Sequence, residues 1–160
     1  MELTIFSDSP QKTIRCGSII GRVAVPGSVI GLTGELGTGK TCFIKGLVAA
    51  IAGVSEQDVA SPTFTFLQEF PGSIPVYHFD LYRIKEPAEL DDVGFYECLY
   101  GTGVTVIEWA ERAAGALPAE RFMIYLAHVD ECRRRITLSA SGERYITMLQ
   151  RVIPVIEGGK

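Results

Sequence analysis

The stretch GELGTGKT, residues 34–41, carries the clearest chemistry in this sequence. It fits the phosphate-binding pattern G-x-x-x-x-G-K-[ST], in which glycines let backbone N–H groups converge on phosphate oxygens without hindrance from a Cβ atom. The helix expected after it adds the dipole of its N-terminus. Lys40 is predicted to contact the β- and γ-phosphates, and the Thr41 hydroxyl to ligate Mg²⁺. The predicted nucleotide contacts of this loop are Gly34, Glu35, Leu36, Gly37, Thr38, Gly39, Lys40, Thr41 and Cys42.

A loop of this kind needs a carboxylate for the metal at the end of a neighbouring buried strand. Glu108 ends the continuous run VTVIE, whereas Asp80 ends PVYHFD, where polar and apolar residues alternate. The buried pattern favours Glu108 as the second Mg²⁺ ligand beside Thr41, and the cost of burying a lone carboxylate also favours a cation partner. Asp80 is instead predicted to orient the attacking water or to couple a loop to the surroundings of the metal. The predicted catalytic residues are therefore Lys40, Asp80 and Glu108.

In the segment HFDLYR, residues 78–83, the question is which way the polar side chains point. In a strand, His78, Asp80 and Tyr82 would share one face, and the apolar residues between them the other. Such a polar face is either the wet side of a half-buried strand or, if this strand lies beside the phosphate loop, a wall of the nucleotide site.

Further candidates flank these segments. Thr63, in SPTF, follows Pro62 in an expected loop and could sense Mg²⁺ and the γ-phosphate, although a plain turn is the commoner explanation. Trp109 either stacks near the nucleotide or is a core aromatic. Arg83 and the cluster 133–135 are charge stabilisers, base contacts or solvated strand-edge charges, and Arg133 is included among the predicted nucleotide contacts.

The elements that must position these residues alternate between strands and helices. Strands are expected at 3–6, 29–33, 63–70, 75–83 and 103–109, with a late hairpin from RFMIYLAH and RRITLSA; helices are expected at 10–24, from the phosphate loop to Gly53, at 87–100 and in a short segment from Gly142. This order predicts an α/β fold, a P-loop NTPase-like three-layer sandwich with a mixed parallel and antiparallel sheet flanked by helices. Residues 1–153 are expected to form a single domain and residues 154–160 a flexible tail.

Composition narrows the class of protein. The chain has 160 residues, 47% of them hydrophobic, and a net charge of −4. A broad basic face for nucleic acid is therefore not expected, although this net charge is compatible with a local basic patch. The N-terminus does not read as a signal peptide, and no apolar run is long enough to span a membrane. Four scattered cysteines without a CxxC pair fit a reducing compartment. A cytoplasmic protein is expected.

Taken together, these residues resemble the TsaE (YjeE) family of small bacterial P-loop ATPases. The shared elements are Thr13-x-x-x-Gly17, GELGTGKT, SPTF, HFDLYR, IEW and a closing basic strand from Arg133 to Gly142. They follow in order along nearly the whole chain, which makes the combination far more specific than the phosphate loop alone. The family usually has Asp where Glu35 stands and Ala where Thr38 stands, and neither side chain has to touch phosphate.

The resemblance implies a Mg²⁺-dependent ATPase that converts ATP to ADP and phosphate and is needed for threonylcarbamoyladenosine modification of tRNA. It would act in complex with the TsaD and TsaB proteins and reach tRNA only indirectly through that complex. By matching position, Lys40 would contact phosphate, Thr41 and Glu108 would hold Mg²⁺, and Asp80 would be required for hydrolysis. The remaining matched positions are Thr63 in the switch loop and Tyr82 and Trp109 near the nucleotide.

Two other functions are compatible with the phosphate loop. A small P-loop kinase would need an acceptor pocket and typically an arginine-bearing lid, and no lid segment is evident in the sequence. A nucleotide-dependent scaffold would bind ATP without functional hydrolysis. Because an arginine that raises the rate roughly a thousandfold or more often comes from a partner protein, weak hydrolysis is expected from the isolated chain.

Overall fold

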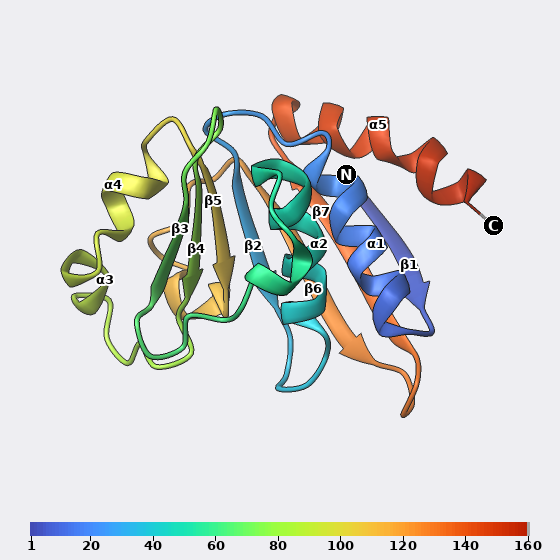
Figure 1. Cartoon of the computed structure of the whole chain (residues 1–160), viewed down its shortest axis with the longest axis horizontal. Coiled ribbons are helices and arrows are strands. Elements are labelled where there is room, and N and C mark those ends of the chain that lie inside the picture. The colour runs from blue at the N-terminus through green and yellow to red at the C-terminus, as the bar shows by residue number, and fades with distance from the viewer. Residues whose placement is uncertain (160) are drawn as a thin grey trace.

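The structure, a computed structural model, describes residues 1–159 and contains a seven-stranded sheet with helices on both faces (Figure 1). The strands are β1 (Glu2–Ser7), β2 (Val29–Thr33), β3 (Leu67–Phe70), β4 (Val76–Asp80), β5 (Val104–Glu108), β6 (Arg121–His128) and β7 (Arg134–Ser141). The helices are α1 (Pro10–Gly21), α2 (Lys40–Ala52), α3 (Glu89–Asp92), α4 (Phe95–Leu99) and α5 (Glu143–Gly158), with 3₁₀ turns η1 (Glu56–Asp58) and η2 (Ala110–Ala113).

The strand order is β1-β7-β6-β2-β5-β4-β3. The central strands β6, β2, β5 and β4 are parallel, whereas β3 pairs antiparallel with β4 at one edge, and β7 and β1 continue antiparallel from β6 at the other. The predicted mixed sheet in an α/β sandwich is therefore confirmed. Because the central strands run the same way, the carboxyl ends of β2, β5 and β4 meet at one edge, which is where open α/β sheets bind ligands.

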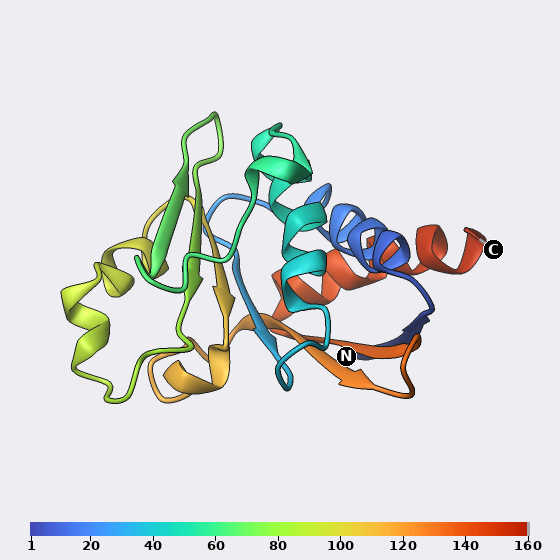
Figure 2. The same ribbon diagram turned by 60° about the horizontal axis from the view of Figure 1, so that its bottom comes forward.

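Helices cover the two faces of the sheet unequally. One face packs against α1, α2 and α5 in the larger apolar core, and Figure 2 shows α1 and α2 lying together over it. The other face packs against α3, α4 and η2 in a smaller core built around Phe79, Phe95 and Ile107. Alternation along β4 and β5 places His78, Asp80 and Glu108 on the face covered by α1 and α2.

Two segments of the predicted sheet are shorter than expected. β4 ends at Asp80 rather than at Arg83, because the Asp80 carboxylate accepts the backbone N–H of Tyr82 at 2.9 Å and turns the chain out of the ladder. β3 begins only at Leu67, because the N–H of Phe66 donates to the carbonyl of Pro62 and Phe66 has a φ of 65°. Tyr82 therefore does not share a strand face with Asp80.

The helices also differ from expectation. α1 stops at Gly21, and the helix expected at 87–100 is divided into α3 and α4, because Gly94 between them has a φ of 71°. The last helix continues through Pro154 to Gly158, where the sequence led us to expect a tail from residue 154. Ile156 still packs against the larger core, and this burial offsets the backbone hydrogen bond that proline removes. Residue 160 lies outside the described residues.

The contact between α1 and α2 depends on two glycines. A Cβ atom on Gly46 would collide with the backbone carbonyl of Ile14, and one on Gly17 with that of Phe43. Because backbone cannot rotate away as a side chain can, Gly46→Ala is expected to lower the free energy of unfolding by about 3 kcal/mol or more in urea denaturation. Gly158→Ala, with open space at its Cβ position, serves as the control and should change it by at most about 1 kcal/mol. Equal stability of the two variants would contradict this packing.

Candidate functional site

The glycine-rich loop joins β2 to the N-terminus of α2, as the phosphate-loop pattern predicts. Gly39 is the N-cap of α2 and has a φ of 100°, a conformation that L side chains rarely adopt. Gly34 has a φ of 149°, and a Cβ atom there would collide with the backbone carbonyl of Leu126 on β6. The path of the loop therefore requires glycine at both positions and leaves the first N–H groups of α2 at its mouth.

Lys40 lies inside this loop rather than in solvent. Lys40 as a whole is 5% exposed. Its Nζ atom donates to the carbonyl of Gly34 at 2.6 Å and to that of Glu35 at 2.8 Å. Nζ also lies 3.9 Å from the centre of the Trp109 ring. Burial lowers the pKa of Lys40, and the nearby carboxylates of Glu108, Glu111 and Asp80 act in the opposite direction. A phosphate group would compete with the two carbonyls for this cation.

Glu108 is buried at the end of β5 and accepts several hydrogen bonds. Thr41 Oγ1 donates to its Oε1 atom at 3.1 Å, and Ser61 Oγ contacts Oε1 at 3.2 Å and Oε2 at 2.9 Å. Burial by itself would raise the pKa of Glu108, but the hydrogen bond and the electrostatic attraction of His78, with the hydrogen bonds from Ser61 and Thr41, outweigh it and hold the pKa below its ordinary value. The two predicted metal ligands, Thr41 and Glu108, are thus adjacent, and Glu108 is ionised.

His78 orients this carboxylate from β4. Its Nε2 atom lies 3.2 Å from Oε2 of Glu108, and its side chain is fully buried. Within the described residues its Nδ1 atom has no hydrogen-bond partner. A proton on Nε2 lets the ring donate to Glu108, which fixes the orientation of this carboxylate.

Asp80, the register neighbour of Glu108, connects to a different set of groups. Its Oδ2 atom accepts the hydroxyl of Thr63 at 2.8 Å, and its Oδ1 atom accepts the N–H of Tyr82. Asp80 therefore ties Thr63 to the end of β4, while Glu108 holds Thr41 and Ser61, so both carboxylates contact the segment SPTF.

The aromatic rings of Trp109 and Tyr82 lie beside Lys40. Trp109 has a left-handed backbone with a φ of 59°, which is strained for a bulky residue, and its ring packs 4.9 Å from that of Tyr82, centre to centre. The ring thus lies between the Lys40 ammonium and Tyr82. Trp109 contacts Lys40 of the phosphate loop and also packs, partly buried, against the smaller core, so both alternatives left by the sequence describe its position in part.

A hollow of about 380 Å³ opens on the other side of the loop. Its lining comes from the start of α1, the phosphate loop and the β6–β7 turn: Asp8, Ser9, Pro10, Thr13, Gly37, Gly39, Cys42, Glu131, Cys132 and Arg134. Arg133 is not part of this lining; its Nε atom instead donates to Asp130 at 2.6 Å on the surface. Arg134 is the arginine of this lining, and its Nη1 atom donates to the carbonyls of Asp130, Glu131 and Arg133 in the β6–β7 turn.

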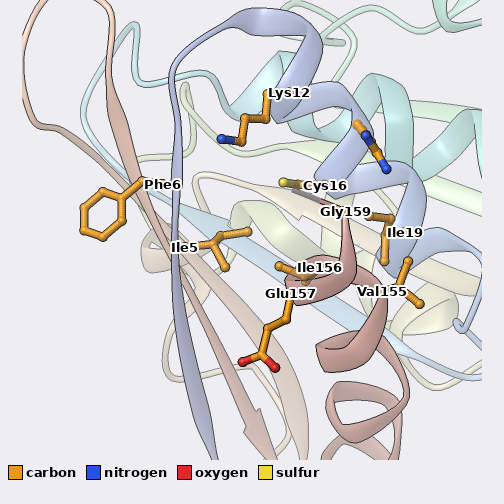
Figure 3. A pocket seen from close by; sticks show the side chains of 10 residues that line it. Ile5, Phe6, Lys12, Cys16, Ile19, Val155, Ile156, Glu157 and Gly159 are labelled. Carbon is orange, nitrogen blue, oxygen red and sulfur yellow. The ribbon is translucent and has the colours of Figure 1, made fainter.

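An apolar hollow lies away from these residues. Figure 3 shows it between β1, α1 and the end of α5, with Ile5, Cys16, Ile19 and Ile156 facing one another and Lys12 at its rim. It contains none of the predicted site residues. Within residues 1–159, no cluster of three or more His, Cys, Asp and Glu side chains could hold a metal, and none of the described helices has the length and apolarity needed to cross a membrane.

Sequence reasoning did not place Ser61 and His78 among the site residues. Both contact Glu108, from positions 47 and 30 residues away in the chain. The signal for Ser61 was only its place before Pro62, which keeps it extended. For His78 it was the polar face shared with Asp80. Nothing in the local sequence reveals that both side chains meet the same carboxylate.

The mixed sheet and the glycine loop between β2 and α2 define an α/β protein whose loop fits the phosphate-binding sequence pattern. The profile of the family described as "Threonylcarbamoyl adenosine biosynthesis protein TsaE" matches residues 7–136. The chain therefore belongs to the TsaE family, as the resemblance in its sequence predicted.

Individual relatives agree with this assignment. The chain is 44% identical over 133 residues to a Treponema pallidum protein named "tRNA threonylcarbamoyladenosine biosynthesis protein TsaE", with 83% of this chain and 97% of that protein covered. A Bacillus subtilis protein of the same name is 38% identical over 138 residues, which cover 86% of this chain and 85% of that protein. The crystal structure of Bacillus subtilis YdiB superposes with a TM-score of 0.75 at 31% identity, covering 95% of this chain and 94% of that one.

Proposed function

We propose that this protein binds ATP with Mg²⁺, hydrolyses it slowly to ADP and phosphate, and serves the threonylcarbamoyladenosine modification of tRNA. The observation that carries this proposal is the convergence of Lys40 and the Thr41–Glu108 pair at the mouth of one glycine loop. The names of the relatives supply the pathway. We also propose that it acts with the TsaD and TsaB proteins.

The residues at the loop fit a magnesium–nucleotide complex. Mg²⁺ prefers oxygen ligands and is usually held by one or two protein groups together with substrate phosphates, which agrees with a hydroxyl and one ionised carboxylate and, within residues 1–159, no larger cluster. Thr41 and Glu108 would hold it, with Ser61 and His78 fixing the carboxylate. When bound, the metal neutralises charge that develops on the phosphate oxygens.

The chain's own groups supply positioning and charge. Lys40 and the free N–H groups at the start of α2 would bind the phosphates, and the hollow beside Gly37 and Gly39 would take the nucleoside. Asp80 would orient the water or, through Thr63, fix the loop beside the γ-phosphate. Phosphoryl transfer to water needs little more than positioning and charge stabilisation, so this set is sufficient for slow turnover.

Asp80→Asn tests this assignment. The variant is expected to bind ATP within about threefold of the unchanged protein, because Asp80 contacts neither Thr41 nor Lys40 by hydrogen bond. Its hydrolysis rate should fall by about 10²- to 10⁴-fold, the usual contribution of a positioned acid or base. Calorimetric titration with ATP and release of labelled phosphate measure the two quantities. Loss of ATP binding in a folded variant would instead make Asp80 part of the metal site.

A second measurement tests the pathway. Cells that depend on a plasmid copy of this gene should lose threonylcarbamoyladenosine from their tRNA when the copy encodes Asp80→Asn. Mass spectrometry of digested tRNA detects the modified nucleoside. Undiminished modification would show that hydrolysis is dispensable and would favour a nucleotide-dependent scaffold.

A further inference from the structure

A second pocket, lined by cations and aromatic rings, lies beside the proposed nucleotide site. It has a volume of about 500 Å³, within the range of ligand pockets, and we call it the Arg83 pocket. Its lining is Phe66, Tyr82, Arg83, Lys85, Glu89 and Arg112, which come from the loop before β3, the segment after β4, α3 and η2. Of these residues, Tyr82 was predicted to lie near the nucleotide and Arg83 to be a charge stabiliser, a base contact or a solvated charge; the other four have no part in the proposed ATPase chemistry.

The three cations of this pocket have no acidic partner. Within residues 1–159, Arg83, Lys85 and Arg112 make no ion pair within 4.0 Å, whereas Lys12 and Arg133 elsewhere on the surface do. The one acid in the lining, Glu89, directs its Oε2 atom to the backbone N–H groups of Lys85 and Glu86 at 2.6 and 2.8 Å. Three cations and one acid leave this lining with two net positive charges, so the pocket favours an anion.

Flat aromatic faces accompany these charges. The guanidinium of Arg83 lies over the ring of Phe64 at 5.3 Å and over that of Phe66 at 6.0 Å. Phe64 is 81% exposed and Tyr82 43%, although large aromatic side chains are usually buried. The left-handed backbone of Phe66 is a strained conformation that turns the chain at this point. Exposed rings next to unpaired cations can stack on planar groups.

We propose that the Arg83 pocket binds single-stranded RNA. A single strand alternates phosphates, which suit the cations, with unstacked bases, which suit Phe64, Tyr82 and the guanidinium plane of Arg83. An acidic peptide would satisfy the cations but leave the exposed rings without planar partners. The RNA of interest is tRNA, and this choice rests on the proposed function. The proposal differs from the expectation from composition, because a net charge of −4 conceals this local patch.

The position of the pocket supports a link to the nucleotide site. Tyr82 lines the Arg83 pocket, and its ring packs against that of Trp109, which lies under the Lys40 ammonium. A base stacked in the pocket would therefore lie two rings from the lysine of the phosphate loop. RNA bound there would contact the protein directly and not only through partner proteins.

Fluorescence anisotropy with the purified full-length protein and a labelled single-stranded oligoribonucleotide of mixed sequence tests this proposal. The double variant Arg83→Gln/Lys85→Gln should bind about tenfold or more weakly. Its salt dependence, as the slope of log K against log salt, should fall by about 0.7 for each phosphate that the two side chains no longer neutralise. Phe64→Leu should weaken binding about fivefold or more without changing that slope, because it removes stacking and no charge. The matched control Arg22→Gln/Arg151→Gln removes two exposed cations elsewhere and should leave the affinity within about twofold.

Three outcomes would overturn the proposal: no measurable affinity of the unchanged protein for the strand, equal weakening in the control and pocket variants, or equal competition by a blunt RNA duplex or by polyglutamate. Preference for polyglutamate would point to an acidic protein partner instead. ATP binding is measured in parallel and should be unchanged in the Phe64→Leu variant, which removes no charge. Failure of RNA binding with intact ATP binding would refute this inference alone, whereas absence of ATP binding by the unchanged protein would refute the proposed function.

Discussion

Glu108→Gln is expected to reduce Mg²⁺-dependent ATP hydrolysis by about a hundredfold or more. The amide has nearly the same size and can keep hydrogen bonds to Ser61 and Thr41, but it carries no charge for the metal. A catalytic metal contributes several kcal/mol to transition-state stabilisation, and about 1.4 kcal/mol corresponds to a factor of ten in rate. Phosphate release at saturating ATP, measured over a range of Mg²⁺ concentrations, gives the rate and the apparent metal affinity.

The control is Glu97→Gln on α4, which changes the same charge at an exposed position. It should leave both rate and metal affinity unchanged. Circular dichroism has to show that the Glu108 variant is folded. If that folded variant hydrolysed ATP at the normal rate with normal Mg²⁺ dependence, Glu108 would not be the metal ligand, and Asp80 would become the candidate.

Lys40→Met is expected to weaken ATP binding by about 10- to 150-fold while leaving the protein as stable as before or slightly more so. The weaker binding follows from removal of a charged hydrogen-bond donor to phosphate, which contributes about 1.5 to 3 kcal/mol. The stability follows from burial, since desolvation already disfavours the charged form and lowers the pKa of Lys40. Methionine has a similar length, and it carries no charge that burial would penalise.

Thermal unfolding with and without Mg²⁺–ATP measures both quantities, because a ligand that binds only the folded state raises the unfolding temperature. The unchanged protein should be stabilised by ATP, and the Lys40 variant should show little stabilisation at the same ATP concentration. Lys45→Met, on the same helix but absent from the contacts of the loop, should behave like the unchanged protein. An ATP-dependent rise of equal size in the Lys40 variant would remove Lys40 from the phosphate site.

Local sequence signals predicted the elements of the fold well. The run VIGLT, the glycine loop and the apolar spacing after it gave β2, the loop and α2 at the expected places. Each of these signals lies within a few residues, because backbone preferences and side-chain periodicity act over one turn or one strand. Three of the misplaced boundaries, at Asp80, Gly94 and Pro154, have different causes. At Asp80 a side chain captured a backbone N–H, at Gly94 the backbone turned left-handed, and at Pro154 burial overrode the local preference.

By itself, the sequence determined that a phosphate loop with Lys40 and Thr41 exists, that Glu108 ends a buried strand, and which family the chain resembles. Only the tertiary structure decided what surrounds the carboxylate of Glu108, because Thr41, Ser61 and His78 reach it across 67, 47 and 30 residues of chain. The same holds for the Arg83 pocket, where Arg112 joins Arg83 and Lys85 from a separate segment. Spacing along a chain specifies local conformation. The groups that surround a charged side chain depend instead on which strands and loops the sheet brings together.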